Sequence, residues 1–183
     1  MVTGKRRHPI FAGPIFELFL LTGSVRSDQV NLGTVDILNY LNFGHVCRMG
    51  VLILQKTVQW VDWDGKGLEH CVCQFDPDGI ELEGVVVGTR NGHYGGSYLV
   101  VTDAMFATRE VKVSYVGGAQ MHVTSDGKGN WFDCIAKREL PSLAGCFDVD
   151  IGITPATNML PIKRLKLTEG EAREISAAYV PLP

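Results

Sequence analysis

From residue 50 onward, hydrophobic side chains recur at every second position in short segments, which is the spacing of strands rather than helices. Residues 80–83 (IELE) and 110–115 (EVKVSY) alternate apolar and charged side chains in this way. Because successive side chains of a strand point to opposite faces, each segment has one apolar face to bury. Turn-forming sequences separate the segments: Asp64-Gly65, Asp76 to Gly79, Asn91-Gly92, Gly117-Gly118 and Asp126 to Gly129. This pattern predicts an antiparallel meander.

The fold class expected from this pattern is mainly β with few helices. The expected strands are 51–54, 57–63, 68–75, 80–87, 98–101, 110–115, 121–124, 131–135, 146–151, 161–167 and 174–180. So many short strands leave exposed edges unless the sheet rolls up, closes or packs as a sandwich. After residue 50 no stretch has the period of an amphipathic helix, except that residues 141–144 could form one short helical turn.

The composition changes near Met49, and we place a domain boundary there. Residues 1–48 are expected to be an N-terminal extension that is poorly ordered or contains a short helix, for example over 33–40. Residues 49–183 are expected to form the β domain. A chain of 183 residues is long enough for one domain with an appendage.

Basic residues followed by an apolar stretch at 9–21 give the N-terminus a superficial likeness to a signal sequence. Pro14 and Glu17 interrupt that stretch, and a short amphipathic helix is an equal alternative. A further alternative is that Met49 is the natural start. We expect a cytoplasmic protein, with the periplasm as the alternative if the segment is a signal.

Composition excludes several classes of function. The net charge is −3, with 17 basic and 20 acidic residues, which argues against binding nucleic acid through bulk charge. No apolar run reaches the roughly 18 residues of a membrane-spanning helix, so an integral membrane protein is not expected. The motifs of nucleotide binding, serine hydrolysis and zinc proteolysis are missing, so we predict no catalytic residue.

The five cysteines do not suggest a disulfide scaffold, because their number is odd and the chain is long. His70, Cys71 and Cys73 could suggest a metal site. On a strand, however, the two cysteines share a face and His70 points away, and no second motif adds ligands. We therefore expect reduced, buried thiols, no metal and no cofactor.

The most distinctive stretch is residues 145–165, which read GCFDVDIGITPATNMLPIKRL. It resembles the bacterial putative glycolipid-binding protein family, formerly a domain of unknown function, almost letter for letter. Weaker likenesses to the family occur earlier in the chain, at 67–70, 108–109 and 126–131, in the same order as in the family. The resemblance covers roughly 57–183. Residues 1–48 have no counterpart in it, which favours Met49 as the natural start.

The resemblance implies an antiparallel spiral β-roll or open barrel, similar to lipoprotein-carrier folds, with a hydrophobic concavity. It also implies a lipid or glycolipid as the binding partner. The family brings no established catalytic residues, so the site residues considered next come from physical reasoning alone.

Asp148 and Asp150 stand two apart in an expected strand, so their carboxylates share a face about 7 Å apart. Paired carboxylates can divide acid and base roles or bind a cation. The alternative is a structural ion-pair network with Lys163 and Arg164. Arg164 could instead bind a ligand phosphate or carboxylate.

Thr157 and Asn158 belong to a connector that Pro155 and Pro161 make rigid. Their side chains could bind sugar hydroxyls or cap backbone groups at a crossover between strands, and the structural role is favoured. Trp60 and Trp131 could line a ligand concavity or belong to the core.

Two further charged residues lie within β-like sequence. Glu69 and Arg109 are expected to form a buried ion pair, since buried charges are normally paired.

Three functions follow from these expectations. The first is non-enzymatic binding of an amphiphile, a glycolipid or acyl chain, in an apolar cavity of several hundred Å³. The second is a hydrolase-like enzyme that uses Asp148, Asp150 or Glu69 in a polar cleft, which requires a carboxyl with a raised pKa. The third is a protein-interaction module with an exposed strand edge or apolar patch. The ligand and the oligomeric state are not predicted.

Overall fold

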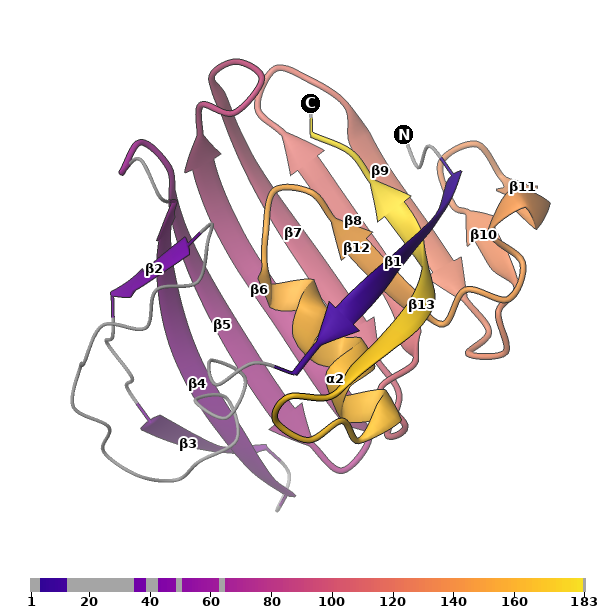
Figure 1. Cartoon of the computed structure of the whole chain (residues 1–183), viewed down its shortest axis with the longest axis horizontal. Helices are drawn as coiled ribbons and strands as arrows, with labels where there is room; N and C mark the ends of the chain where they lie inside the picture. The colour runs from indigo at the N-terminus through magenta and orange to yellow at the C-terminus, as the bar shows by residue number, and fades with distance from the viewer. Residues whose placement is uncertain (1–3, 13–34, 39–42, 49–50, 63–64, 183) are drawn as a thin grey trace.

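The computed structural model describes residues 4–12, 35–38, 43–48, 51–62 and 65–182. A large antiparallel sheet follows the chain strand by strand, as the alternating sequence predicts (Figure 1). Its consecutive strands are β4 (Val51–Asp62), β5 (Leu68–Asp76), β6 (Gly79–Gly88), β7 (Tyr94–Thr102), β8 (Thr108–Tyr115), β9 (Gln120–Ser125), β10 (Trp131–Asp133) and β11 (Arg138–Glu139). Two more strands, β2 (Val35–Leu38) and β3 (Phe43–Arg48), pair with β4. The sheet does not close into a barrel.

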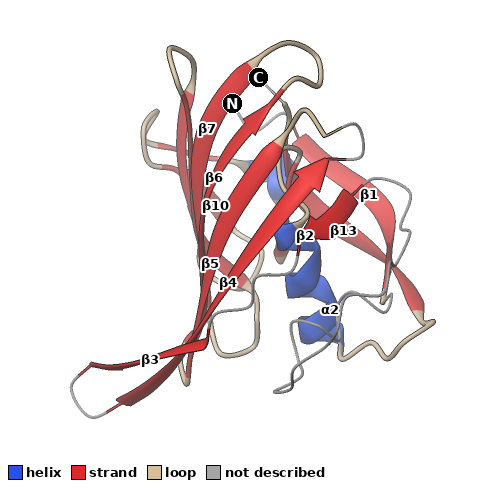
Figure 2. Ribbon diagram, turned by 90° about the vertical axis from the view of Figure 1, so that its left-hand side faces the viewer, coloured by secondary structure: helices blue, strands red, loops and turns tan. Residues whose placement is uncertain are grey.

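A smaller, three-stranded sheet covers one face of the large one (Figure 2). Its strands are β12 (Asp148–Ile151), β13 (Ala172–Val180) and β1 (Gly4–Phe11). The central strand β13 pairs in parallel with β12 and antiparallel with β1. Helix α2 (Met159–Leu165) lies in the same layer and follows the short 3-10 turn η2 (Ala156–Asn158). Another 3-10 turn, η1, spans Pro141–Leu143.

The strand expected over 161–167 is wrong, because most of this segment belongs to helix α2. Pro161 is the third residue of the helix, in the first turn, where its missing N–H costs no intrahelical bond. The buried side chains Met159, Leu160 and Ile162 fit the helical period as well as they fit alternation. The helix ends at Leu165, and the left-handed φ of 53° at the next residue, Lys166, turns the chain so that the N–H of Leu167 donates to the carbonyl of Ile162 at 3.0 Å.

The N-terminal segment also differs from expectation where it is described. Residues 4–11 form strand β1 instead of a helix or an irregular chain, and Val35–Leu38 is a strand within the expected helix 33–40. Because residues 5–7 are all basic, this segment does not show the alternation of apolar and polar side chains that would predict a strand. The remainder of 9–21 beyond residue 12 lies outside the described residues, and the domain boundary at Met49 stays a prediction.

The main core lies between the two layers. The large sheet contributes Leu82, Val100 and Val111, which are almost fully buried. The covering layer contributes Val149, Ile151 and Leu160 to the same cluster. These side chains fill much of the space beneath the large sheet. A cleft, which is the candidate site, remains between the covering layer and strands β4, β5 and β6. No helix in the part of the chain that the structure describes is long and apolar enough to span a membrane.

Candidate functional site

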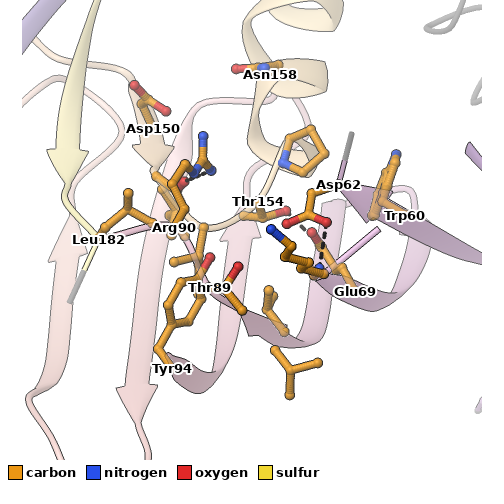
Figure 3. A pocket seen from close by; sticks show the side chains of 18 of the residues that line it. Trp60, Asp62, Glu69, Thr89, Arg90, Tyr94, Asp150, Thr154, Asn158 and Leu182 are labelled. Atoms are coloured by element: carbon orange, nitrogen blue, oxygen red, sulfur yellow. Dashed lines mark hydrogen bonds between the residues drawn. The ribbon is translucent and has the colours of Figure 1, made fainter. Parts of the chain in front are cut away.

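A cleft of about 720 Å³ opens between the large sheet and the covering layer (Figure 3). One wall comes from the inner faces and ends of β4, β5 and β6, and the other from the segment around β12 and the end of β13. Its lining combines apolar, hydroxyl and charged side chains. The lining includes Arg6, Trp60, Asp62, Lys66, Glu69, Val86, Val87, Thr89, Arg90, Tyr94, Asp150, Ile153, Thr154, Asn158, Tyr179 and Leu182.

Glu69 is the most unusual group in the cleft, because it is a carboxyl with only 3% of its surface exposed. The hydroxyl of Tyr98 donates a hydrogen bond to its Oε1 at 2.5 Å, and the hydroxyl of Thr154 donates to the same oxygen at 2.6 Å. Burial raises the pKa of Glu69 to about 7, and the two hydrogen bonds offset only part of this effect. The side chain therefore changes charge near neutral pH.

A glycine allows Tyr98 to reach Glu69 across an intervening strand. Tyr98 lies on β7 and Glu69 on β5, and Gly84 of β6 pairs directly with Tyr98. A Cβ at Gly84 would collide with the tyrosine ring, so the ring occupies the space that a side chain would fill. Gly88 is related to Tyr94 in the same way.

Thr154 owes its position to the turn that precedes the helix. Its Oγ1 accepts a hydrogen bond from the backbone N–H of Ala156 at 2.9 Å, which fixes the start of η2. The same hydroxyl then donates to Glu69. Pro155 occupies the N-cap of η2 with helical backbone angles. A single threonine thus connects the covering layer to the inner face of the large sheet.

Charged side chains of both signs line the cleft. Arg6 lies 3.3 Å from Asp150 Oδ2 and stacks over the ring of Tyr179 at 4.7 Å. Arg90 donates a hydrogen bond to the carbonyl of Gly152 at 2.9 Å. The lining holds three basic side chains (Arg6, Lys66, Arg90) and three acidic ones (Asp62, Glu69, Asp150), so the signs of charge are balanced.

The residues singled out from the sequence do not all meet in this cleft. Trp60, Asp150 and Asn158 line it. Thr157 is buried outside its lining, where its Oγ1 accepts a hydrogen bond from the N–H of Ile151 at 3.4 Å. Trp131 lines a separate cavity of about 500 Å³ beside β9 and β10, and its indole N–H donates to the carbonyl of Cys146 at 2.9 Å.

Asp148 and Arg164 form a two-point ion pair, as one of the sequence alternatives predicts. The guanidinium Nε lies 3.0 Å from Oδ1, and Nη2 lies 2.7 Å from Oδ2. Asp148 is only 1% exposed, and a helix rather than a strand supplies its partner. The neighbouring carboxylate of Asp150 turns to Arg6 and His8 instead of to Lys163.

The prediction that Glu69 forms an ion pair with Arg109 is wrong. Arg109 donates to the carbonyl of Ser125 at 3.0 Å and lies 3.6 Å from Asp103. Glu69 instead accepts hydrogen bonds from two neutral hydroxyls, and burial, which these bonds only partly offset, raises its pKa. The signal available in the sequence was the position of Glu69 on the same strand face as Cys71 and Cys73, which is the buried face.

Cys71, Cys73, Cys134 and Cys146 are free thiols. Sγ of Cys71 lies 3.8 Å from Sγ of Cys73, and both residues are fully buried. Among the residues for which placement is described, no three His, Cys, Asp or Glu side chains gather as a metal site would require.

Comparisons with known proteins agree with this architecture. A crystal structure of a DUF1089 family protein from Pseudomonas aeruginosa is similar, with 33% sequence identity and a TM-score of 0.52. The similarity covers 64% of this chain and 65% of that protein, so it spans just under two thirds of the relative's length. None of the curated proteins matches the sequence. The family model described as "Putative glycolipid-binding" matches residues 57–183, well over half of the chain, and the chain belongs to that family.

Proposed function

We propose that the protein binds an amphiphilic ligand, a glycolipid or another lipid with a polar headgroup, in the cleft between its two layers. The observation that supports this function is that one cavity is lined by both apolar side chains and hydrogen-bonding groups. Trp60, Val86 and Ile153 supply apolar surface, while Glu69 and Thr154 supply hydrogen-bonding groups. A ligand with one polar and one apolar part matches both.

The size of the cleft fits one part of such a molecule. Its volume of about 720 Å³ lies within the range of roughly 300–1,000 Å³ that is typical of small-molecule sites. This space accommodates a headgroup with the start of a chain, or one chain alone. The family name, which refers to glycolipids, is consistent with a sugar as the polar part.

The test is to purify the full chain, extract it with organic solvent and identify co-purifying lipids by mass spectrometry. Calorimetric titration with an alkyl glycoside then measures binding directly. Thr89→Trp places a large ring in the cleft and should abolish binding. Ser97→Trp, at an exposed position of β7 outside the cleft lining, is the matched control and should bind normally. A wild-type protein that carries no lipid and takes up neither alkyl glycoside nor fatty acid would contradict the proposal.

A second candidate function is hydrolysis, and the state of Glu69 favours it. A carboxyl in a cleft with a pKa of about 7 can act as a general acid or base near neutral pH. Asp148 and Asp150, the carboxylates first considered for this role, each lie against an arginine. Release of the chromophore from nitrophenyl glycosides or esters, lost in Glu69→Gln, would support an enzyme. Tight binding of the same compounds without turnover would leave binding as the function.

A further inference from the structure

We propose that Glu69 determines ligand specificity: its Oε2 accepts a hydrogen bond from a hydroxyl of an uncharged sugar headgroup, and the headgroup therefore enters the cleft first. This inference rests on the proposed binding function and adds the class of headgroup, its contact and its orientation.

The geometry of the carboxyl assigns different roles to its two oxygens. The hydroxyls of Tyr98 and Thr154 both donate to Oε1. Tyr98 belongs to the large sheet and Thr154 to the covering layer, so Oε1 is held from both layers. Because Oε1 already accepts two hydrogen bonds, we assign the contact with a molecule in the cleft to Oε2 of a carboxyl that is held in place before a ligand arrives. Preorganisation of this kind lowers the cost of ordering on binding.

The burial of the lining residues determines which end of the ligand lies innermost in the cleft. Glu69, Trp60 and Thr154 are buried, whereas Lys66 and Arg90 are exposed and Val87 is 56% exposed. An alkyl chain placed against Glu69 would exclude water from a carboxyl and return no hydrogen bond, which is costly. A sugar at the same place replaces the water with its own hydroxyls. The chain then extends past Leu182, which lies away from Glu69 (Figure 3).

The charges around the cleft favour an uncharged headgroup. Arg6 is engaged with Asp150, and the guanidinium of Arg90 donates to a backbone carbonyl. A phosphate or carboxylate bound at the inner end would face the carboxylate of Glu69, and like charges in a buried site repel strongly. A sugar hydroxyl can donate to the same oxygen without this penalty.

The charged state of Glu69 makes binding depend on pH. The groups that face this carboxyl are Cys71 on its own strand, Tyr94 and Tyr98 from β7, and Thr154 from the covering layer. The charged groups of the lining are Asp62 from β4, Lys66 and Arg90 from loops, Arg6 from β1 and Asp150 from β12. A hydroxyl donates more strongly to an ionised carboxylate than to the neutral acid. Affinity should therefore rise as the pH passes about 7.

The experiment titrates the full chain with octyl glucoside below its micellar concentration at pH 5.5, 7.0 and 8.5. The wild type should bind about tenfold more tightly at pH 8.5 than at pH 5.5. Glu69→Gln keeps an acceptor for both hydroxyls, so it should fold, bind about tenfold more weakly at pH 8.5 and show no pH step. Glu83→Gln, an exposed carboxyl on β6, is the matched control and should behave as wild type.

Octyl phosphate and octanoic acid serve as comparison ligands with charged headgroups. Each should bind more weakly than octyl glucoside at pH 8.5. A pH step that persists in Glu69→Gln, or a wild type that prefers octyl phosphate, would overturn the role of Glu69 while leaving amphiphile binding intact. A wild type that binds none of the three compounds would overturn the proposed function itself.

Discussion

Tyr98 and Glu69 share a hydrogen bond although a complete strand runs between the two strands that carry them. The bond is possible only because Gly84 leaves the intervening position empty and the tyrosine ring lies across it. The most buried carboxyl of the cleft is thus positioned by a residue without a side chain. This arrangement also makes Gly84 a point at which the site can be disturbed without changing any polar group.

Gly84→Ala should destabilise the protein by about 1–3 kcal/mol, because the new methyl group overlaps the ring of Tyr98. Urea denaturation measures the change. Gly95→Ala is the matched control on β7, since its Cβ would make only ordinary contact at 3.6 Å with Val116. Adding Tyr98→Ala to Gly84→Ala should cost less than the sum of the two single changes. Simple additivity would refute the proposed overlap.

Glu69 should make the protein less stable at pH 8 than at pH 5. Its pKa is about 7 in the folded protein against an ordinary value of 4.5, so the folded state holds the proton more tightly than the unfolded chain. The contribution of the protonated Glu69 to the free energy of unfolding is complete below about pH 4.5 and is lost as the pH rises to about 7. It amounts to about 3 kcal/mol.

Comparison with Glu69→Gln isolates this contribution from other titrating groups. The difference in free energy of unfolding between wild type and variant should change across pH 4.5 to 7 and stay constant above pH 8. A difference that is flat over the whole range would show that Glu69 titrates at its ordinary pKa.

The two aspartates of β12 should respond very differently to loss of their arginines. Arg164→Ala leaves Asp148 as a buried, uncompensated charge, which should cost about 3–5 kcal/mol. Arg6→Ala removes a partly exposed pair with Asp150 and should cost less than about 1 kcal/mol. Thermal and urea unfolding of both variants give the comparison. Equal costs would mean that burial does not distinguish the pairs.

Trp131→Phe should destabilise the protein by about 1–3 kcal/mol, because it removes the indole N–H that donates to the buried carbonyl of Cys146. Phe132→Leu on the next position, which is exposed, is the control and should change stability little. If Trp131→Phe unfolds at the wild-type urea concentration, the hydrogen bond contributes nothing measurable.

Alternation predicted most of the large sheet, because each strand has one buried and one exposed face and its period is therefore visible in the sequence. It failed at residues 161–167, where a buried helix of seven residues is too short to distinguish the two periods. The ion pair of Asp148 could be predicted from chemistry, although the element carrying Arg164 could not. The contact of Tyr98 with Glu69 could not be predicted at all, because it depends on which strands are neighbours and on the register at Gly84.

Strand β1 has a practical consequence for any shortened version of this protein. Arg6 from β1 lines the cleft beside Tyr179 and Leu182 from the far end of the chain. A protein trimmed to begin at Met49 would therefore lose part of one wall, and β13 would gain an open edge able to recruit another chain. Ligand screens on such a truncation would sample a wider, differently charged opening than the one in the intact molecule.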